Sequence, residues 1–89
     1  MIDVRHFAAL KAALTAAGHE FGPVPVEVGS IQLMGFLIRD DGTVLAPTQE
    51  GKLRSANGYV FPDGAVLSPP AVQEFVQSLR EQSAPVETV

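Results

Sequence analysis

The 89-residue chain contains two near-copies of one hairpin. Residues 38–48 and residues 60–70 each consist of an apolar run, an Asp-Gly turn, a Val-Leu pair and a proline, at an offset of 22 residues. An Asp-Gly pair between apolar runs is a strong local signal for a β-hairpin, because glycine adopts the positive φ that such turns need. The repeat therefore predicts two hairpins in the middle of the fold.

Each predicted turn has five residues, with glycine in the fourth place. In residues 61–65, Pro62 fixes φ at the second position, Asp63 tolerates the third, and Gly64 takes the left-handed fourth. Residues 39–43 fit the same three-residue loop with a glycine bulge. Two copies are too few for a solenoid, which needs about three or more repeats, so we expect both hairpins to belong to one meander.

Two further strands are expected before the first turn. Residues 24–28 alternate valine with proline and glutamate, which predicts a half-buried strand. Pro25 has no N–H to donate, so this strand should lie at a sheet edge. A turn at Gly29-Ser30 leads into residues 31–39, the most apolar stretch, which predicts one long strand covered on both faces.

Helices are expected at both ends of the sequence. Residues 3–17 carry apolar side chains on one helical face, with Asp3 as N-cap and Gly18 as terminator. A second amphipathic helix begins after Ser68, a favourable N-cap that is followed by Pro69 at the first helical position.

These elements predict an α+β fold: an N-terminal helix, a five-stranded antiparallel β-meander and a C-terminal helix, packed in two layers. The sheet either stays open or curls strongly at Gly35 into a barrel. Residues 1–82 form a single domain, residues 49–57 a solvated loop within it, and residues 83–89 a flexible C-terminal tail.

Composition excludes several classes of function. The chain has no cysteine, which rules out disulfides, thiolate chemistry and Cys-based zinc sites. The net charge is −4 and the six basic residues are dispersed, so nucleic-acid binding is not expected. No apolar run reaches the roughly 18 residues of a membrane span, and the first residues lack the basic-then-hydrophobic order of a signal peptide. We therefore expect an acidic, cytoplasmic protein without contact to a membrane.

The hydrophobic fraction of 46% is high for so short a chain and has two explanations. Either the alanines of the first helix are exposed, or a second face is buried by a partner or by a second copy. The second explanation favours a homodimer or a subunit of a larger assembly. Its contact surface would be the uncovered face of strand 31–39 with neighbouring aromatics, and the candidate residues are Ile31, Leu33, Met34, Phe36, Tyr59 and Phe61.

Charged residues suggest two other surfaces. Asp40, Asp41 and Asp63 lie at the hairpin tips, where turn chemistry alone explains them. If the tips lie side by side, they form an acidic edge that binds a cation or a basic partner. Lys52 and Arg54, with Asn57 and Tyr59, form a small polar and basic cluster. A solvated loop explains it, and an anionic ligand or a nucleic-acid backbone is the alternative.

No catalytic motif occurs in the chain. His6 and His19 lie near opposite ends of the first helix, about 20 Å apart, and cannot share a metal within one chain. No catalytic residue, metal site or cofactor is expected.

Three functions follow from these observations. The leading prediction is a small non-enzymatic protein-interaction module, self-associating or part of an assembly. The first alternative is a small acidic inhibitor that binds a basic site on a partner protein, including as a mimic of nucleic-acid charge. The second is a ligand-binding or catalytic subunit whose site is completed at an interface by His6 or His19.

Overall fold

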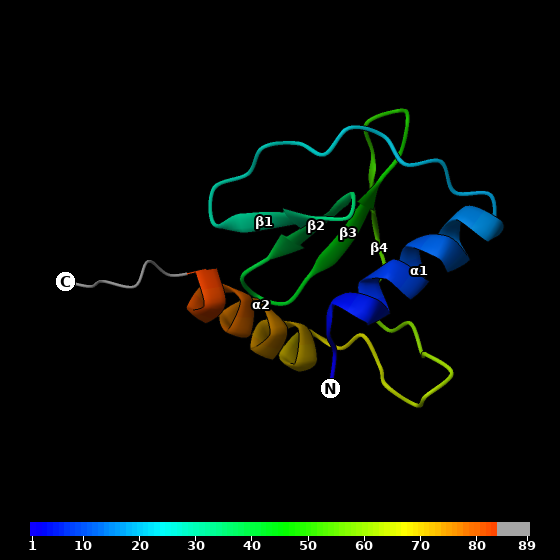
Figure 1. The fold of residues 1–89 in the computed structure, drawn as a ribbon. Helices are drawn as coiled ribbons and strands as arrows, with labels where there is room; N and C mark the ends of the chain where they lie inside the picture. The colour runs from blue at the N-terminus through cyan, green and yellow to red at the C-terminus, as the bar shows by residue number, and fades with distance from the viewer. Residues whose placement is uncertain (84–89) are drawn as a thin grey trace.

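The computed structural model describes residues 1–83, which form two helices and a four-stranded sheet (Figure 1). In chain order the elements are α1 Val4–Ala16, β1 Ser30–Leu33, β2 Phe36–Arg39, β3 Val44–Pro47, β4 Leu53–Ser55 and α2 Pro69–Ser83. The sheet order is β1-β2-β3-β4, and every neighbouring pair is antiparallel. The predicted α+β class and the antiparallel meander between two helices are confirmed, with four strands in place of five. Ser83 ends α2, and the rest of the predicted tail lies outside the described residues.

Both helices begin where the sequence predicts. The Asp3 carboxylate accepts a hydrogen bond from the Arg5 N–H at 2.9 Å, and α1 ends just before Gly18, whose φ is +97°. At α2, the Ser68 carbonyl accepts from the Val72 N–H at 2.9 Å. Neither helix in the described part of the chain is long and apolar enough to cross a membrane.

The predicted strand 31–39 is two strands. It reverses direction at Met34 and Gly35, whose φ values are +52° and +88°, and Leu33 pairs with Phe36 across the turn. Two positive φ angles define a type I′ hairpin turn. Gly35 therefore marks a chain reversal and not the bulge or bend that its position in an apolar run indicated.

The predicted edge strand 24–28 is not formed. The chain turns one residue earlier than expected, because the Ser30 N–H donates to the Glu27 carbonyl at 3.3 Å and Gly29 takes a φ of +82°. Beyond this turn Pro25 has no N–H with which to continue a ladder to β1. Residues 24–28 therefore pass the sheet without forming a β-ladder with β1.

The two repeated turns have the same backbone geometry. In the first turn the Arg39 N–H donates to the Thr43 carbonyl, and the Gly42 N–H donates to the Arg39 carbonyl. In the second turn the same two bonds join Phe61 to Ala65 and Gly64 to Phe61, and all four distances are 2.8–3.0 Å. A third turn of this form, residues 48–52, joins β3 to β4 within the predicted loop. The second repeated hairpin has backbone hydrogen bonds and the isolated bridge Val60–Val66 but no regular strand, so the two strands expected there are not formed.

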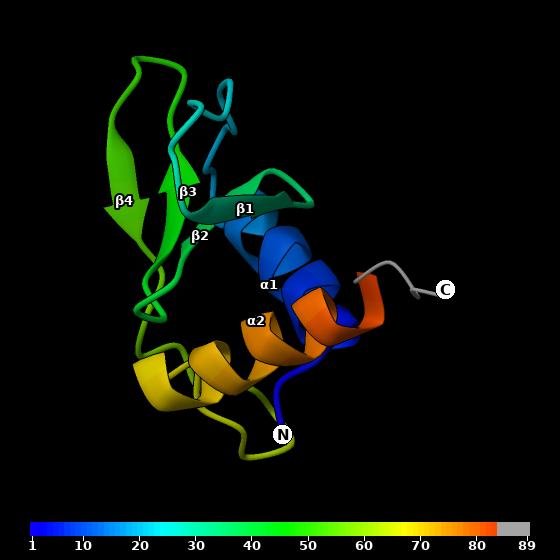
Figure 2. The ribbon, with the colours of Figure 1, turned by 90° about the vertical axis from the view of Figure 1, so that its left-hand side faces the viewer.

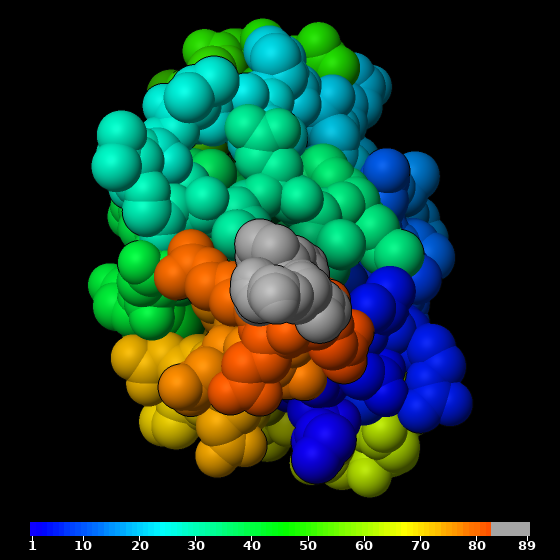
Figure 3. Space-filling view, turned by 60° about the vertical axis from the view of Figure 1, so that its left-hand side comes forward, coloured from blue at the N-terminus to red at the C-terminus, as the bar shows by residue number. Residues whose placement is uncertain are grey.

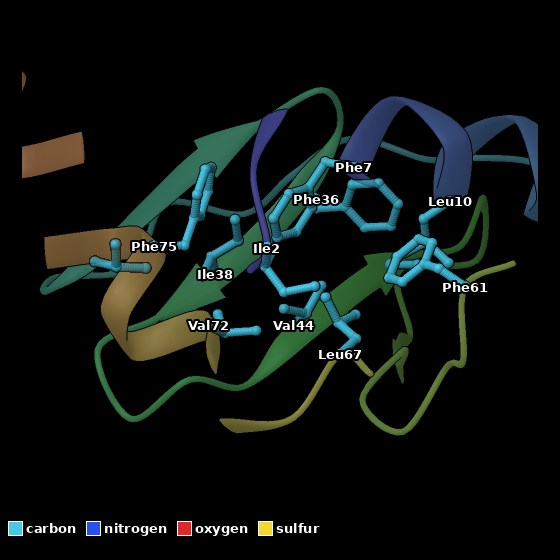
Figure 4. Close-up of a cluster of buried hydrophobic side chains, with 12 residues drawn as sticks. Ile2, Phe7, Leu10, Phe36, Ile38, Val44, Phe61, Leu67, Val72 and Phe75 are labelled. Carbon is cyan, nitrogen blue, oxygen red and sulfur yellow. The ribbon is translucent and has the colours of Figure 1, made fainter. Parts of the chain in front are cut away.

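The core lies between one face of the sheet and the two helices (Figure 4). Phe7 of α1 stacks on Phe75 of α2 at 5.0 Å between ring centroids, and meets Phe36 of β2 edge-on at 5.9 Å. Figure 3 shows α2, in orange, between the N-terminal residues, in blue, and the β1 region, in green.

The opposite face of the sheet is also buried. Leu37 and Leu45 are 0% and 6% exposed, yet alternation along the strands places them away from the helix-facing core. Residues 22–28 run across this face. The Gly22 N–H donates to the Pro47 carbonyl at 3.2 Å, and the Glu27 carboxylate accepts from the Arg39 guanidinium at 2.7 Å. The chain therefore covers its second apolar face itself (Figure 1).

Candidate protein-interaction edge

The predicted interface residues do not form one exposed surface. Phe36 and Phe61 are buried, with 0% and 3% of their surface exposed, so they are not available to a partner. Three more, Ile31, Leu33 and Tyr59, pack partly buried against the core. The physical reason is that the helices and residues 22–28 cover both faces of the sheet. Only Met34, at the tip of the β1–β2 turn, is exposed, at 37%.

The three carboxylates of the predicted acidic edge have separate partners. Asp40 pairs with Arg80 of α2 at 2.6 Å. Asp41 accepts hydrogen bonds from the hydroxyl and the N–H of Thr43, which lower its pKa. Among residues 1–83, no group of three histidine or acidic side chains is placed to hold a metal ion.

Asp63, the third of these carboxylates, contacts His6 at the start of α1. The His6 Nδ1 accepts from the Asp3 N–H at 3.1 Å, so its Nε2 carries the proton and donates to Asp63 at 2.9 Å. The Ala65 N–H and this imidazole lower the pKa of Asp63. Both ring nitrogens of His6 are thus engaged in joining the second repeated turn to α1.

His19 also makes a structural contact. Its Nε2 donates to the Pro47 carbonyl at 3.0 Å, and its ring meets Phe21 edge-on at 4.5 Å. One nitrogen, Nδ1, has no partner in the described part of the chain. In residues 1–83 neither histidine contacts a hydroxyl nucleophile: His6 contacts Asp3 and Asp63, and His19 contacts the Pro47 carbonyl.

Two basic side chains of the described chain that make no ion pair and no aromatic contact lie at β4. Three arginines form ion pairs, and a lysine lies over an aromatic ring: these are Arg5 with Asp3, Arg39 with Glu27, Arg80 with Asp40, and Lys11 over Phe21. Within residues 1–83 the two remaining basic side chains, Lys52 and Arg54, have no ion-pair partner. Both are exposed: Arg54 lies in β4, and Lys52, the last residue of the 48–52 turn, lies two residues before it in the same register.

The outer edge of β4 carries unpaired backbone groups. The Thr48 N–H donates to the Lys52 carbonyl at 2.8 Å, and the Ala56 N–H donates to the Val44 carbonyl at 2.9 Å. Residues 52, 54 and 56 therefore direct their backbone groups toward β3. Alternation in an antiparallel ladder then directs those of Leu53 and Ser55 outward. In Figure 2 no element lies beyond β4.

The other sheet edge, at β1, is partly closed by the chain itself. The Ser30 N–H, which points outward from the sheet, donates a hydrogen bond to the Glu27 carbonyl. The Gln32 side chain donates to the Pro25 carbonyl at 3.4 Å. Strands β1 and β4 do not pair with each other, so the sheet does not close into a barrel. Of the two edges, β4 is the more open.

Two surface depressions adjoin Arg54 on the side of β4 that faces α1. One, of about 240 Å³, has a mixed lining in which Leu14, Ala46 and Ala56 are apolar and His19 and Ser55 are polar. The other, of about 330 Å³, lies beside His19 and Glu50. The guanidinium of Arg54 borders both, so it has open space on more than one side.

Comparison of the chain with models of protein families, with curated proteins and with solved structures found no match.

The sequence contained a weak signal for β4. Residues 48–52 include Gly51, with a φ of +84°, in the same fourth place as the glycines of the repeated turns. The position lacks the aspartate or proline that marked the other two turns, and the strand that follows, Leu-Arg-Ser, has no β-branched residue. The sequence marks Lys52 and Arg54 as a basic cluster, but does not indicate that Arg54 belongs to a strand.

Proposed function

We propose that this protein is a non-enzymatic protein-interaction module that binds a partner through the open edge of β4. The observation that carries the proposal is the pair of outward-facing residues, Leu53 and Ser55, on an edge strand that nothing else in residues 1–83 covers. An unpaired strand edge is a template for the addition of a strand from another chain.

The size of this edge sets the expected strength of binding. Two outward residues offer two N–H donors and two carbonyl acceptors. Each backbone hydrogen bond contributes a net of about 0.5–1.5 kcal/mol, so four bonds alone support only weak, reversible binding. Side-chain contacts at Lys52, Arg54 and the adjoining depressions would have to supply the rest of the affinity and the specificity.

The edge favours a different partner over a second copy. Antiparallel self-pairing that uses both Leu53 and Ser55 places Arg54 opposite Arg54 of the second copy. Like charges directly opposite one another in a sheet are destabilising. Of the two forms of the module that the sequence left open, binding to another protein has more support than self-association.

The two alternative functions receive less support. An acidic inhibitor needs free carboxylates at the hairpin tips, whereas Asp40 and Asp63 contact Arg80 and His6. A site completed by a histidine needs a free imidazole, whereas both nitrogens of His6 are engaged within the chain.

Proline substitution at the open edge tests the proposal. Ser55→Pro removes the outward N–H of residue 55 without touching a bond to β3. Ser55→Ala is the matched control, since it keeps the N–H and removes only the hydroxyl that accepts from the Asn57 N–H at 3.3 Å. We expect peptides selected from a displayed library of random octapeptides on the wild-type chain to bind Ser55→Ala equally and Ser55→Pro at least about tenfold more weakly.

Leu53→Pro, which removes the other outward N–H, serves as a second variant if Ser55→Pro does not fold. Thermal unfolding and the amide spectrum of β2 establish that each variant is folded. Failure to select any peptide, or equal binding to folded wild-type and proline variants, would overturn the proposal.

A further inference from the structure

We propose that the segment added to β4 is acidic, with a carboxylate side chain opposite Arg54. This inference rests on the proposed function and assigns its class of partner: an extended segment of another protein that carries aspartate or glutamate.

The first argument is the distribution of charge. The chain has a net charge of −4, yet of the three basic side chains without an ion pair in the described residues, Lys11, Lys52 and Arg54, the last two lie at its open strand edge. Lys52 and Arg54 are about 7 Å apart, since a strand rises roughly 3.3 Å per residue. An added strand has the same rise, so alternate acidic side chains on it meet both cations.

The second argument is the register of the ladder. An added strand would bond to Leu53 and Ser55, which leaves one of its residues directly opposite Arg54 on the face toward α1. Opposite charges at directly opposed positions stabilise a sheet. The depressions on either side of Arg54 leave room for a carboxylate to reach the guanidinium, which can bind it in a two-bond geometry.

The third argument concerns the side from which a carboxylate approaches Arg54. Glu20 and Glu50 line the depression of about 330 Å³, whereas the depression of about 240 Å³ has no acidic lining residue. A carboxylate is therefore repelled on the Glu50 side and accepted on the side of Leu14 and Ala56. The partner's acidic residues should lie near Arg54, with aliphatic residues beside them.

The test compares two synthetic probes on the full chain. One is a blocked hexapeptide that alternates aspartate with valine, and the other replaces each aspartate by lysine. Exposed ion pairs are individually weak, so two of them give an expected preference of about five- to tenfold for the aspartate peptide at low salt. The preference should decrease at high salt, because salt screens exposed charges.

Charge reversal provides the matched variant. Lys52→Glu together with Arg54→Glu should invert the preference, with Ser55→Ala as a control that leaves it unchanged. Equal binding of both peptides to the wild-type chain, or a preference unaffected by charge reversal, would overturn the acidic partner while the strand-edge function stands. Failure of both peptides to bind at Leu53 and Ser55, judged by their amide resonances, would overturn the proposed function as well.

Discussion

Two glycines in equivalent turn positions have different surroundings. Gly42 and Gly64 both have a φ of +90°. A Cβ added to Gly42 would lie 2.2 Å from the carbonyl oxygen of Pro69, whereas a Cβ at Gly64 would meet nothing within 4 Å. The glycine of the first turn is thus needed for conformation and for close approach to α2, and the glycine of the second turn for conformation alone.

Alanine substitution should separate these two roles. Gly64→Ala should lower the free energy of unfolding by about 1–2 kcal/mol, the cost of a left-handed conformation for a residue with a Cβ. Gly42→Ala should cost clearly more, because the backbone at the start of α2 has to move. Urea unfolding of both variants under the same conditions measures the difference. Equal losses of stability would show that the contact with Pro69 does not constrain the turn.

At the scale of the elements, the sequence predicted both helices and the two repeated turns, since caps, apolar spacing and Asp-Gly pairs are local signals. It missed the reversal at Met34-Gly35, because a non-glycine residue with positive φ is uncommon and methionine gives no sign of it. The alternation in residues 24–28 is present, but the proline removes a donor that a ladder needs.

The start of α1 yields a prediction about pH. A hydrogen bond from the Arg5 side chain lowers the pKa of Asp3 from 3.8 to about 2. Because the folded-state pKa is depressed, the ionised carboxylate stabilises the fold above pH 3.8, and this contribution is lost as the pH falls toward 2.

Asp3→Asn keeps a side-chain oxygen that can cap the helix and removes the charge. The wild-type chain should therefore be more stable than Asp3→Asn near pH 6, and the difference should shrink between about pH 4 and pH 2. Urea unfolding of both variants across this range measures it. A difference that stays constant with pH would contradict the role of the Asp3 charge.

At the scale of the whole molecule, the fold accounts for part of the high apolar content, although Val26 and Val28 stay 93% and 101% exposed. A second buried face exists, as the composition suggested, but residues 22–28 of the same chain cover it. This arrangement was not predictable from local patterns, because it depends on Gly22 and Glu27 reaching β3 and β2 across the sheet. It also moves the expected contact surface away from residues 31–39.

The candidate site was predictable only in part. Lys52 and Arg54 stood out as a basic cluster, since charge is visible in a sequence. Lys52 and Arg54 matter because most of the other basic residues form ion pairs. These ion pairs join residues far apart in the sequence, such as Asp40 and Arg80, and so cannot be read from local patterns. The open edge likewise depends on which strand lies outermost in the sheet.

Amide hydrogen exchange at β4 tests the central claim most directly. In the free protein, the amides of Arg54 and Ala56, which face β3, should exchange slowly, and those of Leu53 and Ser55 should exchange fast. Saturation with a peptide selected on the wild-type chain should protect Leu53 and Ser55 and leave Arg54 and Ala56 unchanged. Protection of Leu53 and Ser55 in the free protein, or their continued fast exchange in the complex, would contradict an open edge that accepts a strand.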